Sequence, residues 1–146
     1  MMTGKTPKDQ QAIPSRILHT MLRVSDLDRS VNFYENALAM QVFSRETFSK
    51  GRFTLVFMGY GNPTSAPCVE LTYNWDQDDY RHGNGYGHIA LQVTDIYAAC
   101  DRLSGLGVSI LRDPGPMSYQ SDEIGHSDTI AFIEDPDGYK IELIQI

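Results

Sequence analysis

The sequence is poor in cysteine, in tryptophan and in basic residues. Its 146 residues include two Cys, one Trp, and 12 Lys and Arg against 19 Asp and Glu. Two cysteines are too few for a disulfide framework, and Cys68 and Cys100 are not spaced as metal ligands. Because a formal net charge of -7 repels phosphate backbones and anionic membrane surfaces, we expect no nucleic-acid partner.

Long apolar runs are also missing. No segment reaches the roughly 18 consecutive apolar residues of a membrane-spanning helix, so we expect no membrane partner. Residues 1–14 are polar, contain Pro7 and Pro14, and lack the apolar segment of a secretory signal. They predict a flexible N-terminal tail. We therefore expect a cytoplasmic protein whose folded part begins after residue 14.

The folded part contains an internal repeat. The motif H-x-x-L-x-V-[ST]-D occurs at residues 19–26 and again at residues 88–95. A second pair of similar triplets follows, Val-Glu-Leu at residues 69–71 and Ile-Glu-Leu at residues 141–143. Self-similarity of this kind indicates a duplicated unit. The predicted modules are residues 15–84 and 85–146.

Both modules have the same predicted order of elements. Alternation predicts a strand at each motif, and Ser25 and Thr94 are predicted to cap the helices that follow. Apolar residues recur at helical spacing from Leu27 to Leu38 and from Ile96 to Leu106. Further strands are predicted at residues 40–43, 52–58, 67–74, 108–111, 129–134 and 139–146. The predicted fold class is α+β, with two tandem βαβββ modules.

Strand geometry groups four residues that can bind a metal. Alternate residues of a strand share a face, and His19 and Glu70 lie on polar faces of the first and last strands of the first module. His88 and Glu142 occupy the equivalent positions of the second module. One such residue alone is more commonly structural, but the pair recurs. Imidazole and carboxylate ligands without sulfur suit a divalent ion such as Ni, Co, Fe, Mn or Zn.

Five segments carry a family resemblance. They are LHTMLRV at residues 18–24, FMGYG at 57–61, VELTYNW at 69–75, YGHIAL at 86–91 and AFIEDPDGYKIEL at 131–143. Together they resemble glyoxalase I, the lactoylglutathione lyases of the vicinal oxygen chelate superfamily, and the resemblance extends over about residues 16–146. It implies a homodimer with active sites at the subunit interface. Each metal would take His19 and Glu70 from one chain and His88 and Glu142 from the other.

The resemblance also implies an activity, which is isomerisation of the hemithioacetal of methylglyoxal and glutathione to S-D-lactoylglutathione through a cis-enediolate. Glu142 is the implied base, and Glu70 serves the other substrate enantiomer. Arg23 and Asn74 match positions that hold the glutamyl end of glutathione. The short segment at residues 75–87 is similar to that of bacterial members activated by nickel or cobalt, so Ni or Co is expected, with Zn as an alternative.

One loop departs from the family pattern and leaves the thiol open. Residues 117–129 form a longer loop than in bacterial relatives and include no Lys or Arg. The loop carries three acids, Asp122, Glu123 and Asp128. Because acids disfavour the glycyl carboxylate of glutathione, another thiol is an alternative unless the loop folds aside. His82 and His126 lie in predicted loops and are expected to be surface residues.

Other functions occur on the same fold. Metal-dependent thiol transfer and ring-cleaving dioxygenation use two histidines and one glutamate, and drug-binding dimers of this architecture use no metal. The fourth ligand, Glu70, argues against the first two, because it removes an open coordination position. The presence of a complete ligand set argues against the third.

Overall fold

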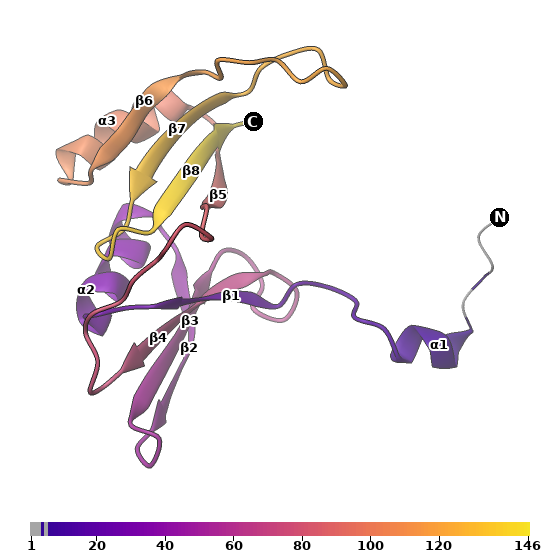
Figure 1. Cartoon of the computed structure of the whole chain (residues 1–146), viewed down its shortest axis with the longest axis vertical. Coiled ribbons are helices and arrows are strands. Elements are labelled where there is room, and N and C mark those ends of the chain that lie inside the picture. The colour runs from indigo at the N-terminus through magenta and orange to yellow at the C-terminus, as the bar shows by residue number, and fades with distance from the viewer. Residues whose placement is uncertain (1–3, 5) are drawn as a thin grey trace.

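The structure, a computed structural model, describes residue 4 and residues 6–146 and contains two four-stranded sheets (Figure 1). In chain order the elements are α1 (Pro7–Gln11), β1 (His19–Arg23), α2 (Leu27–Asn32), the π-helix η1 (Phe33–Ala37), β2 (Gln41–Phe48), β3 (Phe53–Gly59), β4 (Cys68–Asn74), β5 (Ile89–Val93), α3 (Ile96–Gly105), β6 (Ile110–Pro116), β7 (Thr129–Glu134) and β8 (Lys140–Gln145). Among the described residues, no helix is long and apolar enough to cross a membrane.

The two sheets have the same topology. The strand order is β1-β4-β3-β2 in the first sheet and β5-β8-β7-β6 in the second. β1 and β5 run parallel to their neighbours, and the other pairs are antiparallel. The helices that follow β1 and β5 lie on the same side of the molecule, at the left of Figure 1. The structure confirms the α+β class with two repeated units, in which β1 and β5 are edge strands.

Most strands match their predicted positions. Four of the later strands, β3, β4, β7 and β8, begin and end within one residue of the predicted ranges. β2 and β6 extend beyond the predicted residues 40–43 and 108–111. Each of these two strands forms an antiparallel hairpin with the strand that follows it, and the pairing continues along the hairpin.

The helix caps differ from the prediction by one residue. Asp26 and Asp95, rather than Ser25 and Thr94, cap α2 and α3, and their carboxylates accept backbone N–H groups of the first helical turn at 3.1 and 3.0 Å. A carboxylate here also interacts favourably with the positive end of the helix dipole. The hydroxyl of Ser25 instead donates to Asp137 of the second module, at 2.5 Å.

The first helix does not continue as an α-helix to Leu38. Its last turn is the π-helix η1, in which the Leu38 N–H donates to the carbonyl of Phe33, five residues back, at 3.3 Å. The guanidinium of Arg102, from α3, donates to the carbonyls of Asn36 and Ala37, both at 2.7 Å. The second module therefore satisfies carbonyls that the end of this helix leaves free.

One hydrophobic core extends through both modules. It includes Leu22 and Leu27 of the first module and Ile96 and Leu143 of the second, all at most 6% exposed. The apolar stripe predicted for α3 is buried except at Leu106, which is 56% exposed. The two modules therefore pack as parts of one unit.

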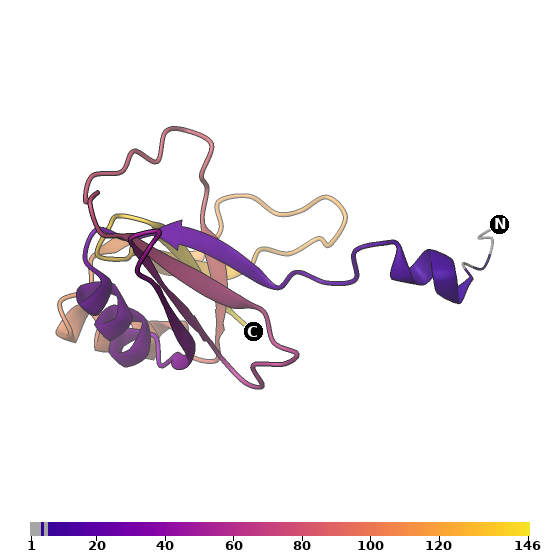
Figure 2. The ribbon, with the colours of Figure 1, turned by 90° about the horizontal axis from the view of Figure 1, so that it is seen from below.

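The N-terminal segment is not entirely irregular. Within the tail predicted for residues 1–14, α1 forms a helix of five residues in which Thr6 and Asp9 make a capping box. None of its residues is buried, and the segment projects away from the sheets (Figures 1 and 2). Residues 1–3 and 5 of the predicted tail lie outside the described residues. The helix is therefore stabilised by its own cap rather than by packing.

Candidate functional site

The first candidate pair lies on β1 and β4. Their parallel register places His19 beside Cys68 and Met21 beside Glu70. The Nε2 atom of His19 lies 2.7 Å from the Oε2 atom of Glu70, and these side chains are 38% and 14% exposed. The hydroxyl of Thr72 donates to the other oxygen of Glu70 at 3.4 Å. The strand alternation predicted this shared face of His19 and Glu70.

The same arrangement recurs in the second module. His88 directly precedes β5, and the register of β5 with β8 places Glu142 beside Ala90. The Nε2 atom of His88 lies 3.3 Å from the Oε1 atom of Glu142, and these side chains are 41% and 13% exposed. In both modules, the glutamate therefore lies beside the residue two positions after the histidine.

Each histidine also contacts a phenylalanine ring edge-on. The ring centroids of His19 and Phe57 are 5.3 Å apart, and those of His88 and Phe132 are 5.2 Å apart. Phe57 lies beside Glu70 in the register of β3 with β4, and Phe132 lies beside Glu142 in that of β7 with β8. Sequence reasoning assigned neither ring to the site. Extending the internal repeat to β3 and β7 would have found them, because both follow the same pattern.

A thiol lies next to the first pair. Cys68 is beside His19 in the strand register and is partly exposed. Burial raises the pKa of the Cys68 thiol, and the carboxylate of Glu70 raises it further. A protonated thiol is a poor metal ligand. This neighbour is therefore compatible with a ligand set of imidazole and carboxylate alone.

The predicted thiol-binding residues lie at one end of the first sheet. Arg23 is the last residue of β1 and is exposed, and Asn74 is the last residue of β4. The amide of Asn74 donates to the hydroxyl of Tyr80 at 3.2 Å. This contact from the connecting segment orients the Asn74 side chain, and sequence reasoning did not identify Tyr80.

The two His–Glu pairs do not meet within one chain. Over residue 4 and residues 6–146, no three His, Cys, Asp or Glu side chains lie close enough to share a metal ion. One nitrogen and one oxygen are only part of the about four to six ligands that a divalent transition metal takes. Each module therefore presents one His–Glu pair, which has fewer donors than such a metal takes.

The remaining histidines and the acidic loop lie apart from the pairs. His126 is exposed, as predicted, whereas His82 is half-buried because its ring stacks on Tyr139 at a centroid distance of 4.1 Å. The three acids of residues 117–129 are exposed. One of them, Glu123, accepts a hydrogen bond from Ser121 of the same loop at 3.0 Å.

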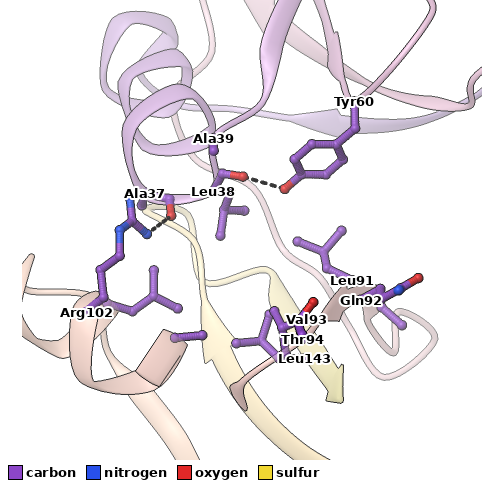
Figure 3. Close-up of a pocket in the computed structure, with 13 residues that line it drawn as sticks. Ala37, Leu38, Ala39, Tyr60, Leu91, Gln92, Val93, Thr94, Arg102 and Leu143 are labelled. Atoms are coloured by element: carbon purple, nitrogen blue, oxygen red, sulfur yellow. Dashed lines mark hydrogen bonds between the residues drawn. The ribbon is translucent and has the colours of Figure 1, made fainter. Parts of the chain in front are cut away.

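A pocket of about 550 Å³ lies between the modules and contains neither pair (Figure 3). The end of η1, Tyr60, β5 and α3 bound it. Two of its polar side chains bind backbone carbonyls, since Tyr60 donates to Leu38 at 2.5 Å and Arg102 to Ala37 at 2.7 Å. Among the described lining residues there is no His, Asp or Glu. We assign this pocket to the packing of the modules rather than to chemistry.

Proteins similar in sequence include lactoylglutathione lyases from several bacteria. The chain is 50% identical over 130 residues to the lactoylglutathione lyase of Neisseria meningitidis, which covers 89% of this chain and 90% of that protein. It is also 50% identical over 129 residues to a probable lactoylglutathione lyase of Synechocystis, with 88% and 94% covered.

Solved structures and a family model agree with these relatives. Glyoxalase I from Zea mays superposes with a TM-score of 0.82 at 38% identity, over 90% of this chain and 44% of the maize chain. The trypanothione-dependent glyoxalase I of Leishmania major superposes with a TM-score of 0.75 at 40% identity, over 90% and 87%. The family model described as the glyoxalase/bleomycin resistance protein/dioxygenase superfamily matches residues 16–143. With the repeated sheets and both His–Glu pairs in place, the chain belongs to this superfamily.

Proposed function

We propose that the chain is a metal-dependent glyoxalase I, which isomerises the hemithioacetal of methylglyoxal and glutathione to S-D-lactoylglutathione. The repeated His–Glu pair carries this proposal. Within each pair, an imidazole nitrogen lies close to a carboxylate oxygen, at 2.7 Å in the first module and 3.3 Å in the second, so that both atoms can bind the same metal ion. The relatives at 50% identity are named for the same activity. Methylglyoxal detoxification in the cytoplasm is the corresponding physiological role.

The active form is a homodimer with its sites at the subunit interface. Each site takes His19 and Glu70 from one chain, with His88 and Glu142 of the partner subunit. The separation of the two pairs within one chain supports this arrangement, because two donors alone do not complete a coordination shell. The exposed faces of both pairs leave room for a second subunit, with histidine exposures of 38% and 41%.

The four donors fit a divalent transition metal, with nickel as the first choice and cobalt as the second. Neutral imidazoles and carboxylates are ligands for such ions, and nickel holds six ligands more readily than zinc. When bound, the metal supplies Lewis-acid stabilisation of negative charge on the substrate oxygens, which makes the substrate C–H bond more acidic. His19 and His88 serve as fixed ligands, and the rings of Phe57 and Phe132 restrict their rotation.

A glutamate acts as the base that transfers the proton. Glu142 takes the proton from C1 of the hemithioacetal and returns it to C2, so the reaction is an isomerisation without a redox partner. Glu70 does the same for the other enantiomer. Arg23 binds the glutamyl carboxylate of glutathione through a charge-assisted hydrogen bond, and Asn74, oriented by Tyr80, binds the same end.

A second thiol remains a specific alternative to glutathione. The related Leishmania enzyme is described as trypanothione-dependent, so this fold accepts a different thiol there. The negative charge of the three acids in residues 117–129 is an argument for a thiol with less negative charge than glutathione. Two observations argue for glutathione instead: the acids are exposed, and Glu123 accepts a hydrogen bond within its own loop, so their charges face solvent rather than the thiol.

Reconstitution tests the activity. Metal-free protein supplied with Ni²⁺, methylglyoxal and glutathione is expected to form the lactoyl thioester, followed by its ultraviolet absorbance and identified by NMR. No thioester with any of Ni²⁺, Co²⁺ or Zn²⁺ would refute the proposal.

Complementation tests the shared site. His19→Ala and His88→Ala proteins are each expected to be inactive, and subunit exchange between them should restore activity, because one of the two sites in the mixed dimer regains all four ligands. A verified mixed dimer without activity would mean that each chain builds its own site.

A further inference from the structure

The end of β1 at Arg23 lies on an open sheet edge. β1 pairs with β4, and the N–H of Val24 donates to Thr72 of β4 at 2.9 Å. The C=O of Arg23 belongs to the same peptide unit and points in the opposite direction, as does the next N–H, that of Ser25. Both groups therefore face the side of β1 that has no neighbouring strand.

A turn of the second module satisfies both groups. The hydroxyl of Tyr139 donates to the C=O of Arg23 at 2.8 Å. One carboxylate oxygen of Asp137 accepts the N–H of Ser25 at 3.1 Å and its hydroxyl at 2.5 Å. The turn at residues 135–139 thus acts in place of an adjacent strand at the position where the Arg23 side chain leaves the sheet.

The turn is itself held firmly. Asp135, which is 4% exposed, accepts the backbone N–H groups of Asp137 and Tyr139, both at 2.9 Å. Gly138 has a φ of 83°, which other residues rarely adopt. Tyr139 is 8% exposed, and its ring stacks on His82 with an interplanar angle of 10°. The position of the Tyr139 hydroxyl is therefore set by the turn and the stacked ring together.

We propose that Tyr139 is a positioning residue for Arg23, so that the second module orients the side chain that binds the glutamyl end of the thiol. This inference rests on the proposed function. Arg23 acts on a remote part of the substrate, not on the reacting carbons. Loss of its orientation should weaken substrate binding and leave proton transfer unchanged.

The test is Tyr139→Phe, which removes the hydroxyl and keeps the ring. Loss of one hydrogen bond is expected to raise KM for the glutathione hemithioacetal about two- to tenfold, with kcat within about twofold of wild type. Tyr34→Phe is the matched control. Its hydroxyl belongs to the same contact between modules but donates to Asp135 rather than to β1, at 2.7 Å. The control should lose stability and keep the wild-type KM.

A double-mutant cycle separates positioning from general loosening. In an Arg23→Gln background, adding Tyr139→Phe should raise KM by less than about twofold, because the side chain that it orients is gone. An unchanged KM for Tyr139→Phe alone, or an equal increase in both backgrounds, would overturn the inference.

Binding of S-methylglutathione, an unreactive analogue, keeps this test separate from the proposed reaction. Calorimetry should give a Kd for Tyr139→Phe that is raised by the same factor as KM. Wild-type protein that binds the analogue but forms no thioester would refute the proposed reaction and leave the Kd comparison to decide the role of Tyr139. Wild-type protein that does not bind it would overturn the inference.

Discussion

Tyr34→Phe should destabilise the protein by an amount that depends on pH. Tyr34 and Asp135 are 1% and 4% exposed, and the Tyr34 hydroxyl donates to the Asp135 carboxylate at 2.7 Å. Burial raises the pKa of Tyr34 far above its usual value, so the hydroxyl remains a donor. Removing a hydrogen bond to a buried charged group costs about 1.5–3 kcal/mol. For a chain of this size, the Tm should fall by about 3–12 °C.

The pKa of Asp135 gives the sign of the pH dependence. Burial raises this pKa above that of an ordinary aspartate, and the hydrogen bond from Tyr34 opposes the rise. Because the folded state binds the proton more tightly than the unfolded state, Asp135 contributes stability below its unfolded pKa, and this contribution is lost as pH rises through the folded pKa. In Tyr34→Phe the pKa of Asp135 rises further. The variant should therefore be most destabilised at neutral pH and less so in acid.

Urea unfolding followed by circular dichroism, at one protein concentration and at about pH 7.5 and about pH 5, measures both effects. Tyr60→Phe is the control, because the Tyr60 hydroxyl donates to the carbonyl of Leu38, which does not titrate. Its loss of stability should be the same at the two pH values. No loss of stability at neutral pH for Tyr34→Phe would refute the assignment of a hydrogen bond to a buried, charged Asp135. An equal loss at both pH values would mean that the carboxylate stays charged over this whole range, and would contradict the predicted pH dependence.

Three further predictions concern the reaction. Glu142→Gln should lower kcat of the metal-loaded enzyme by about 10²-fold or more, because an amide does not accept the proton. Sedimentation should still report a dimer, and activity within a few fold of wild type would exclude Glu142 as the base. Metal-free protein should recover full activity with Ni²⁺ or Co²⁺ but little with Zn²⁺, because zinc readily adopts four-coordination. Equal activity with Zn²⁺ at full occupancy would contradict the assignment of nickel or cobalt. Replacing the three exposed acids of residues 117–129 by Asn or Gln should change kcat/KM for the glutathione hemithioacetal by less than about twofold, since exposed charges contribute little. A rise at low salt that vanishes at high salt would instead place these acids near the bound thiol.

The sequence by itself determined the modules and the candidate ligands. The repeated H-x-x-L-x-V-[ST]-D motif predicted two equivalent strand–helix units, and the two four-stranded sheets have matching strand orders. Strand alternation placed His19 and Glu70 on the polar faces of their own strands, and the pairing of β1 with β4 brings these faces together, with the two side chains 2.7 Å apart. These features are predictable because side-chain alternation and helical spacing depend on residues a few positions apart.

Only the tertiary structure decided how the modules join. Ser25 lacks its predicted capping role because Asp26 accepts the helix N–H group and Asp137, far along the chain, takes the Ser25 hydroxyl. The hydrogen bond from Tyr139 to Arg23 likewise joins segments that are distant in sequence. Contacts of this kind depend on how the sheets and turns pack in three dimensions, and short-range periodicity carries no information about that packing.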